Sequence, residues 1–218
     1  MAKVFIISDL HFPYHNKKAY NKMMKLIRKH KPTHVVQIGD CLDQYVFSKY
    51  ARSMRISPEH DISQGIALMQ GMWKEIKRML PRAKCYQLMG NHDVRLSKRI
   101  AELLPELTEF FNHRDLYKLS GVTVLDSDKD FLEIEGVIYV HGYLTKSIDH
   151  AKHFNKPTVH GHRHQPMIDT HDRLWSMDVG FLADIGQLPL QYTQSKVVKW
   201  RLACGLVDNK QPSLFFLD

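Results

Sequence analysis

The feature that most constrains the fold is a unit that repeats through the first half of the chain, in which a short apolar run is followed by a helical pattern. The apolar runs cover residues 4–8, 34–38 and 84–88. Between them, residues 17–30 and residues 62–80 carry apolar side chains at helical spacing. Short apolar runs rich in β-branched residues are typical of buried strands. The alternation of strands with helices therefore indicates a largely parallel sheet with crossover helices.

The second half of the chain has a different pattern, in which short apolar or alternating runs are separated by turn residues. These runs predict strands over residues 122–125, 131–134, 137–141, 158–160, 167–170, 174–178 and 197–207, with a hairpin loop over 207–213. Residues 94–104 favour a helix, whereas residues 105–119 give no clear pattern. The layout predicts an α/β protein with two sheets packed together, each flanked by helices.

Length and composition bound how the chain is organised. With 218 residues, no segment of similar sequence that recurs and no Pro/Gly/Ser linker, we expect a single domain over residues 1–218. Cys41, Cys85 and Cys204 form no CxxC pair and leave one cysteine over, which predicts buried reduced thiols. No apolar run approaches the roughly 18 to 20 residues that span a bilayer, and the apolar start is too short for a signal peptide. We therefore expect a cytoplasmic protein with no membrane partner.

Charge and histidine content point to the kind of partner. The formal net charge is +8, which favours a polyanion such as nucleic acid. Residues 17–30 place several of the Lys and Arg side chains on what is expected to be one helix face. The 14 histidines are dense for this length, and several adjoin Gly, Asp or Asn in short motifs. Those motifs are where we expect the chemistry.

Five polar motifs follow predicted strands, each at the point where a strand ends. They are Asp9-Leu10-His11, Gly39-Asp40 with Asp43, Gly90-Asn91-His92-Asp93, His141-Gly142 and Gly161-His162-Arg163-His164. In an open α/β sheet the carboxyl ends of neighbouring strands face one crevice, so the five loops are expected to converge. Carboxylates and imidazoles held at strand ends suit metal binding, because a rigid scaffold lowers the cost of gathering charged ligands.

In their order, these motifs resemble the signature of the calcineurin-like metallophosphoesterase superfamily, which is DxH, GDxxD, GNH(D/E), a separate His and GHxH. The resemblance spans residues 9–164 and fills every signature position. It implies a compact member without a cap domain, folded as a four-layer αββα sandwich of two packed mixed β-sheets flanked by helices. By similarity, one metal ion would be held by Asp9, His11, Asp40 and His164, and a second by Asp40, Asn91, His141 and His162.

The resemblance thus implies two divalent metal ions that share the Asp40 carboxylate. A shared carboxylate lets two cations lie roughly 3.5 to 4 Å apart, and a water bridging both ions would have its pKa lowered toward neutrality, which gives a hydroxide nucleophile. Imidazole, carboxylate and amide ligands without thiolate suit transition metals better than calcium. We expect manganese, with iron, zinc or nickel as alternatives.

Four residues near the predicted ligands have other expected roles. His92 resembles the non-ligand histidine of the family, placed to protonate the leaving alkoxide or to stabilise charge in the transition state. Asp43 would orient His92 and raise its basicity. Asp93 is expected to fix the loop or a ligand histidine, and Arg95 is a candidate for binding the substrate phosphate with its bidentate fork.

The resemblance implies hydrolysis of phosphate esters and leaves the substrate open. Gln44 follows the GDxxD motif where phosphoprotein phosphatases of the superfamily carry Arg, which disfavours a protein phosphatase. The basic balance and the lack of a cap favour a phosphodiesterase or nuclease acting on nucleic acid or nucleotides. The alternatives are a nucleotide or other small-molecule phosphomonoesterase and, from a different class, a non-catalytic metal-binding module that interacts with nucleic acid.

Overall fold

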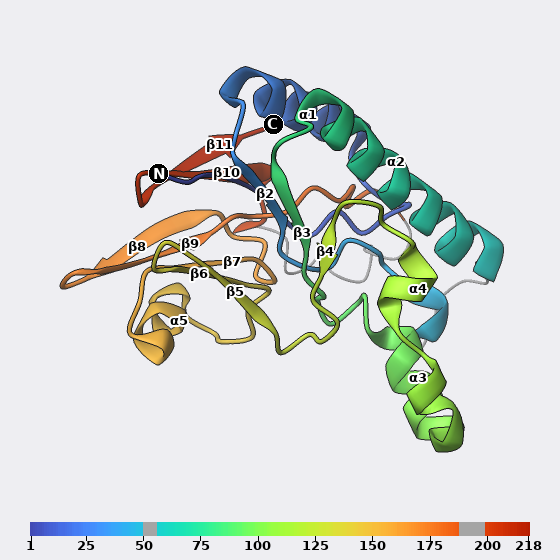
Figure 1. Cartoon of the computed structure of the whole chain (residues 1–218). Coiled ribbons are helices and arrows are strands. Elements are labelled where there is room, and N and C mark those ends of the chain that lie inside the picture. The colour runs from blue at the N-terminus through green and yellow to red at the C-terminus, as the bar shows by residue number, and fades with distance from the viewer. Residues whose placement is uncertain (50–55, 188–198) are drawn as a thin grey trace.

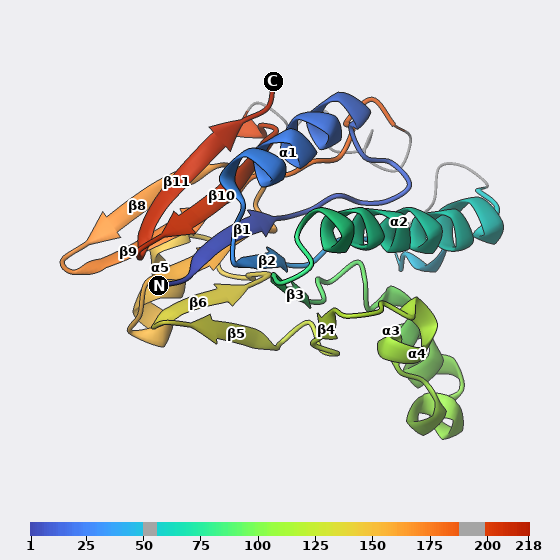
Figure 2. The same cartoon turned by 45° about the horizontal axis from the view of Figure 1, so that its top comes forward.

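Two mixed β-sheets pack against each other in the computed structural model, which describes residues 1–49, 56–187 and 199–218. Helices cover the outer faces of both sheets, α1 and α2 on one side and α5 on the other (Figures 1 and 2). This arrangement confirms the predicted α/β class and the four-layer αββα sandwich of two mixed sheets flanked by helices.

The first sheet combines the parallel strands of the first half of the chain with a hairpin from its end. Its strand order is β11-β10-β1-β2-β3-β4. The bounds are β1 (Lys3–Ile7), β2 (His34–Gln37), β3 (Lys84–Gln87), β4 (Thr123–Val124), β10 (Ala203–Asp208) and β11 (Gln211–Phe216). Strands β1 to β4 are parallel, and β10 runs antiparallel to β1 and to β11. The hairpin predicted near the end of the chain is therefore present, although its loop is residues 209–210 and not 207–213 as predicted.

Strand β1 shows how alternation builds two core layers. Phe5 and Ile7 are fully buried in the layer between this sheet and helices α1 (Lys17–His30) and α2 (Gln64–Met79). Val4 and Ile6 point the other way and are buried in the layer between the two sheets. Successive strand residues face opposite sides, so an apolar residue at every position implies burial on both faces. That is why the run appears continuous in the sequence.

The two crossover helices lie where the sequence predicts them. Helix α1 begins after Asn16, whose side-chain oxygen accepts a hydrogen bond of 3.0 Å from Ala19 N, and ends at Lys31 in a left-handed conformation. A π-helical turn (Glu59–Ser63) leads into α2.

The three cysteines are buried and free, as predicted from their spacing.

The second sheet is built from the strands predicted in the second half, plus one helix that the sequence analysis missed. Its order is β5-β6-β7-β9-β8. The bounds are β5 (Phe131–Ile134), β6 (Val137–Val140), β7 (Thr158–His160), β8 (Met167–His171) and β9 (Leu174–Asp178). Helix α5 (Ser147–Phe154) connects β6 to β7, which are parallel and therefore need a crossover. The helix has only eight residues, too few for its apolar spacing to stand out.

The segment after β3 and the end of the chain complete the fold. Helix α3 (Arg95–Leu103) matches the predicted helix, and the uninterpreted stretch after it forms a 3₁₀ helix (Pro105–Phe110) and α4 (His113–Tyr117). The prediction of a strand over residues 197–207 is corrected, because β10 begins only at Ala203, and residues 197–198 lie outside the described residues. Its partner β1 ends at Ile7, and Leu202, just before β10, forms an isolated bridge with Phe181 instead.

Candidate metal centre

Three loops of the first sheet run side by side beyond the ends of β1, β2 and β3. They bring together Asp9, His11, Asp40, Asp43, Asn91, His92 and Asp93. Backbone pairing continues past the strand ends, since Asp9 N donates to Gly39 O at 3.1 Å and His11 N donates to Asp40 O at 3.0 Å. The loops are thus extensions of the sheet rather than free connections, which fixes the side chains that they carry.

Two loops of the second sheet meet them. His141 follows β6, and His162 and His164 follow β7. His164 Nε2 lies 2.9 Å from Asp9 Oδ1, and His162 N donates to Asp9 Oδ2 at 3.2 Å. Gly161 N donates to His141 O at 2.9 Å, which holds these two loops together. The five predicted loops therefore converge.

Glycines allow the loops to approach this closely. A Cβ atom at Gly161 would collide with Ser8 Oγ and Asp9 Oδ2, and one at Gly90 would collide with the Asp40 carboxylate. Any side chain at either position would force the loops apart. The glycines of the motifs are therefore needed for the contact between loops.

The side chains form two compact groups that could each hold a metal ion. The inner cluster consists of Asp9, His11 and His164, and the outer cluster of Asp40, His141 and His162; within each, one ligand atom per residue lies within 4.8 Å of the others. Asn91 joins the outer cluster, with its Oδ1 3.1 Å from His141 Nε2. A third group of the same compactness contains His11, Asp43 and His92.

The Asp40 carboxylate belongs to the outer cluster and lies on its side toward the inner one. Its Oδ2 is 3.3 Å from His141 Nε2 of the outer cluster and 4.0 Å from His11 Nε2 of the inner one. His11 Nε2 is buried without a hydrogen-bond partner among the described residues, as is His164 Nδ1. Buried polar atoms are rarely left unpaired. The unpaired His11 Nε2, which lies 3.9 Å from Asp9 Oδ1 and 4.0 Å from Asp40 Oδ2, fits a divalent metal ion.

The charges of the site also fit cations. Burial alone would raise the pKa of Asp9, but the adjacent His164 lowers it to about 2. Burial likewise opposes ionisation of Asp40, yet His141 and His92 hold its pKa well below the usual range. Burial would lower the pKa of His141, but Asp40 raises it to about 9. The site therefore keeps two negative carboxylates in a buried position, where positive charge is needed to balance them.

Five of the predicted ligands have an unusual backbone conformation. Asp9, His11, Asp40, His162 and His164 all have positive φ angles, between 49° and 67°. Residues other than Gly seldom adopt this left-handed region, although Asp and His tolerate it better than most, and such residues cluster at functional sites. The backbone is thus held in the shape that turns these side chains toward one another.

Asp43, His92 and Arg95 form a connected group beside the clusters. Asp43 Oδ2 lies 2.9 Å from His11 Nδ1 and 3.5 Å from His92 Nδ1, so it is closer to the predicted ligand than to the predicted acid. Arg95 Nη1 donates to Asp43 O at 2.9 Å, and Arg95 Nη2 lies 3.0 Å from His92 Nε2. Burial lowers the pKa of His92, and the Asp40 and Asp43 carboxylates only partly offset this.

The contact with Arg95 assigns the tautomer of His92. A guanidinium group only donates hydrogen bonds, so His92 Nε2 must accept and the ring is neutral. The proton is then on Nδ1, which lies 3.2 Å from Asp43 O. In this arrangement His92 has no proton available on the side of Arg95.

Asp93 ties two of the loops together through their backbone. Its carboxylate accepts hydrogen bonds from Leu42 N and Gly90 N, both at 2.8 Å, and from Cys41 N at 3.2 Å. Burial raises the pKa of Asp93 to about 7. The side chain therefore supports the loops of Asp40 and Asn91 rather than pointing into either cluster.

Some supporting residues were not predicted from the sequence. The ring of Trp200 meets the His164 ring edge-on with centroids 4.3 Å apart, and Phe181 stacks on the same ring at 5.2 Å. On the other side, His150 Nε2 accepts from Tyr143 N at 3.2 Å and shapes the loop after His141. These residues lie outside the signature motifs, so only the fold shows that they contact residues of the metal centre.

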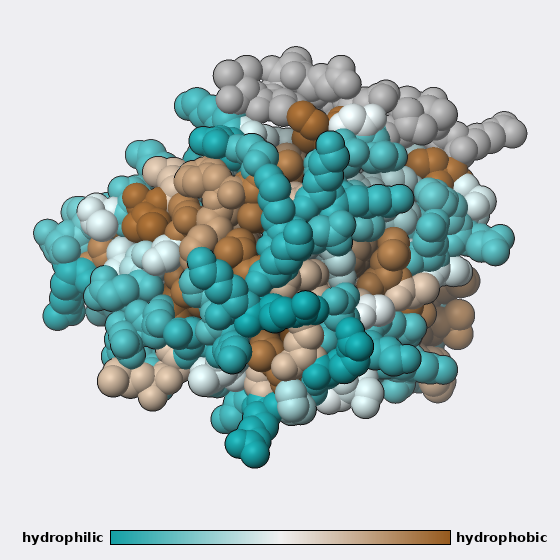
Figure 3. Space-filling view, turned by 90° about the horizontal axis from the view of Figure 1, so that it is seen from above, coloured by the Kyte–Doolittle hydropathy of each residue, from teal (hydrophilic) through white to brown (hydrophobic). Residues whose placement is uncertain are grey.

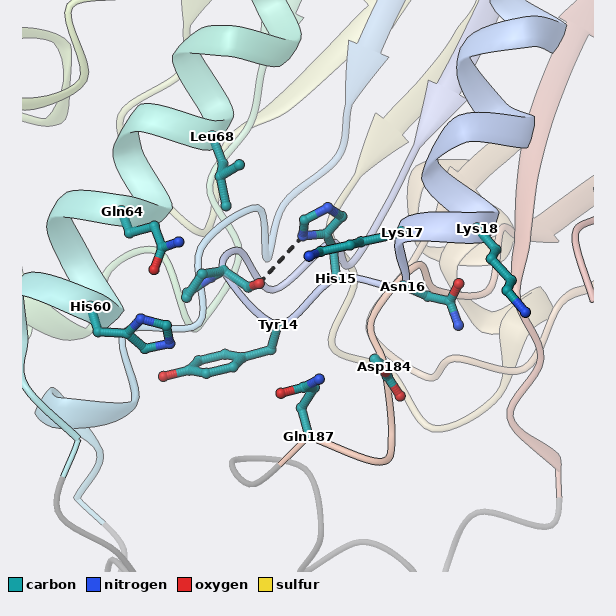
Figure 4. A pocket seen from close by; sticks show the side chains of 11 residues that line it. Tyr14, His15, Asn16, Lys17, Lys18, His60, Gln64, Leu68, Asp184 and Gln187 are labelled. Atoms are coloured by element: carbon teal, nitrogen blue, oxygen red, sulfur yellow. Dashed lines mark hydrogen bonds between the residues drawn. The ribbon is translucent and has the colours of Figure 1, made fainter.

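A pocket opens beside the loop that follows His11 (Figure 4). Tyr14, His15, Lys17 and Lys18 line it from this loop and from α1, and His60, Gln64 and Leu68 line it across from α1. His15 Nδ1 lies 3.3 Å from Pro13 O, and burial lowers the pKa of its ring. None of the described lining residues belongs to the inner or outer cluster. The pocket therefore flanks the centre without sharing its side chains.

Comparisons with known proteins agree with this geometry. The chain is 24% identical to the gene 54 protein of Mycobacterium phage D29 and 25% identical to that of phage L5, each alignment covering 94% of this chain and 88% of the relative. The solved structure of Vps29 from Chaetomium thermophilum superposes with a TM-score of 0.50 at 11% identity, covering 98% of this chain and 84% of that one. This likeness concerns the fold alone.

Within the described ranges, no helix is both long and apolar enough to cross a membrane.

The model of the calcineurin-like phosphoesterase family matches residues 2–209, which include every motif of the centre. The chain therefore belongs to the calcineurin-like phosphoesterase family.

Proposed function

We propose that this protein is a phosphodiesterase that hydrolyses nucleic acid or nucleotides with two divalent metal ions, acting as one domain over residues 1–218. The observation that carries the proposal is the position of Asp40 on the side of the outer cluster toward the inner one, within 4.0 Å of a histidine nitrogen of each. A carboxylate placed in this way suits a pair of cations close enough to act on one phosphate.

Each cluster has a proposed ligand set. We assign Asp9, His11, Asp40 and His164 to one ion and Asp40, Asn91, His141 and His162 to the other. Bound ions would activate the attacking water and neutralise charge on the phosphate. The ligand chemistry is compatible with manganese, our first choice, and with iron, zinc or nickel.

The protein's own side chains would position the ester and manage its charge. Arg95 Nη2 lies 3.0 Å from His92 Nε2, and the guanidinium keeps N–H groups that can form a bidentate contact with phosphate. If Arg95 turns from His92 to the incoming phosphate, His92 Nε2 becomes free to take up a proton from water and to pass it to the leaving alkoxide. Asp43 holds the Nδ1 side of His92 through its backbone oxygen and its carboxylate, at 3.2 Å and 3.5 Å.

The test is a comparison of two esters with the same chromogenic leaving group, one a phosphodiester and one a phosphomonoester, with added manganese. Asp40→Asn is the inactive reference. Asp172→Asn is the matched control, because Asp172 is exposed in the turn between β8 and β9 and its left-handed backbone suits Asn. We expect preference for the diester, loss of about 10³-fold or more in Asp40→Asn and wild-type activity in Asp172→Asn.

Each other outcome has a defined meaning. Preference for the monoester replaces the diesterase with a nucleotide phosphomonoesterase. No turnover of either ester with manganese, iron, zinc or nickel, together with retained metal and nucleic-acid binding, replaces the enzyme with a binding module. A cytoplasmic location stays a prediction, to be tested by locating the protein in the cell that makes it.

A further inference from the structure

A second pocket lies directly against the outer cluster, on the side of α3. Phe47, Lys49, Asn91, Arg95, Lys98 and Arg99 line it, and the cavity has a volume of about 260 Å³. Asn91 and Arg95 belong to the metal centre as well, since Asn91 Oδ1 lies 3.1 Å from His141 Nε2 and Arg95 contacts His92. A molecule bound in this pocket would therefore lie directly beside the ester that reacts at the metal centre.

The charge of the pocket is strongly one-sided. Four of its lining residues are basic and one, Glu102, is acidic. Lys98 Nζ lies 2.6 Å from Asp128 Oδ2 and Arg99 Nη1 lies 2.9 Å from Glu102 Oε2, and the side chains of Lys98, Arg99 and Glu102 are exposed while that of Asp128 is half-buried. Exposed ion pairs contribute little to stability. A phosphate group can therefore compete for these cations at little cost.

The pocket also offers an apolar surface. Phe47, half-buried at the end of a 3₁₀ helix (Tyr45–Phe47), lines the same cavity as the cations. An aromatic ring beside a line of Lys and Arg is the combination that binds single-stranded nucleic acid, because bases stack on the ring while cations hold the backbone phosphates. A phosphomonoester with a small leaving group needs neither feature.

The geometry points to this pocket as the subsite for the nucleotide next to the scissile phosphate of a single-stranded nucleic acid, with Phe47 stacking on its base and Lys98 and Arg99 binding the adjoining phosphate. This inference rests on the proposed function and names its substrate class. Arg95 connects the subsite with the centre, because it lines the pocket and contacts His92.

Another basic surface competes with this subsite and supplies a matched control. Lys25 and Arg28 lie on the exposed side of α1, one helical turn apart, and line a shallow pocket with Glu75. Figure 3, which views the molecule from the side of α1 and α2, shows hydrophilic side chains across this face. This pair matches Lys98 and Arg99 in charge, is exposed to solvent and has no aromatic residue in its pocket.

The experiment measures binding of a fluorescent single-stranded oligonucleotide with phosphorothioate linkages, which keep the charge and resist cleavage, to the full chain with manganese. For the double variant Lys98→Gln/Arg99→Gln we expect Kd to rise about tenfold or more, and the slope of log K against log salt to fall by about 1.4. Phe47→Ala should raise Kd by about tenfold. Lys25→Gln/Arg28→Gln should change Kd by less than about twofold.

Hydrolysis separates this inference from the proposed function. In Lys98→Gln/Arg99→Gln, kcat/KM for an oligonucleotide should fall at least about fivefold further than kcat/KM for the small chromogenic diester. Equal weakening by the α1 variant, or no weakening by the α3 variant, overturns the subsite even if diester hydrolysis is confirmed. If no ester is hydrolysed but the α3 variant still weakens oligonucleotide binding, the subsite stands and the proposed function fails.

Discussion

The inner and outer clusters have similar ligands and differ in how far solvent reaches them. In the inner cluster Asp9, His11 and His164 are 0%, 1% and 7% exposed, whereas in the outer cluster His162 is exposed to solvent. Phe181 and Trp200 cover His164, and the outer cluster borders the open pocket through Asn91. A closed site holds its ion tightly, and an open one exchanges it. We therefore expect an ion in the inner cluster to stay bound, and an ion in the outer cluster to exchange with solvent and to face the substrate.

The difference also appears in how the ligands are held. Asp9 is fixed by its contact with His164, by Ser8 Oγ and by the backbone N–H of His162, so three neighbours hold one carboxylate. His162 donates its backbone N–H to Asp9, and its ring, which meets the His141 ring edge-on with centroids 5.2 Å apart, reaches solvent. The part of the His162 ring that packs against the protein is desolvated, and this together with the nearby His141 lowers its pKa to about 4, which keeps the ring neutral and ready to bind a metal at neutral pH.

Loss of the inner carboxylate should have the largest effect. Asp9→Asn removes a charge at the centre of the inner cluster, so diester turnover should fall by about 10³-fold and added metal should not restore it. The measurement is kcat over a manganese titration, with bound metal counted by elemental analysis. Asp172→Asn serves as the control. Recovery of turnover at high manganese would show that the inner site is as exchangeable as the outer one.

Loss of the exposed ligand should have a smaller effect that metal can reverse. His162→Ala leaves the inner cluster intact, so it should weaken binding of only one of two ions, by about 10- to 100-fold, and turnover should return as manganese is raised. Calorimetric titration of the metal-free protein checks this, with His171→Ala on exposed β8 as the matched control. Loss of both ions from His162→Ala would show that the two clusters bind as one unit.

A buried acid outside both clusters should affect stability and leave metal binding as it is. Burial raises the pKa of Asp61 to about 6, above the value near 3.9 of an unfolded chain, so the folded state favours the protonated form. Its contribution to stability is therefore present at low pH and is lost as the pH rises through about 6.

Asp61→Asn removes this titration, while its side-chain oxygen can still accept from Val46 N, a bond of 2.8 Å in the structure. Relative to the wild type, the free energy of unfolding of the variant should rise by about 2 kcal/mol from pH 4 to pH 7.5. Unfolding of the wild type and the variant by denaturant at pH 4 and at pH 7.5 measures this difference. A difference that does not change with pH would mean that Asp61 is ionised in the folded state throughout this range.

Much of the fold was accessible from sequence because its strands are buried on both faces and its crossover helices are long. Helix α1 has the bounds that its apolar spacing predicted. Helix α5 was missed because its eight residues span barely two turns, and β10 is shorter than its apolar run because pairing with β1, not composition, sets where it begins. Periodicity reports burial, whereas strand ends depend on partners.

The features of the site likewise divide into those that the sequence motifs predict and those that depend on the fold. The residues predicted as ligands converge because motifs at strand ends are brought together by the topology of any such sheet. The contact of Arg95 with His92 depends on the direction in which α3 leaves the loop, and the packing of Trp200 on His164 joins residues 36 positions apart in the sequence. Neither follows from a motif, because both depend on side-chain placement in three dimensions.

The left-handed backbone at five of the proposed ligands also limits how this protein can evolve. Val, Ile and Thr are especially unfavourable at positive φ, so a mutation to one of them at these positions would damage folding together with metal binding. Asn, Asp, His and Gly remain as tolerated replacements. A descendant that gives up catalysis is therefore expected to do so by exchanges such as Asp to Asn, and to keep a centre that still looks complete in outline.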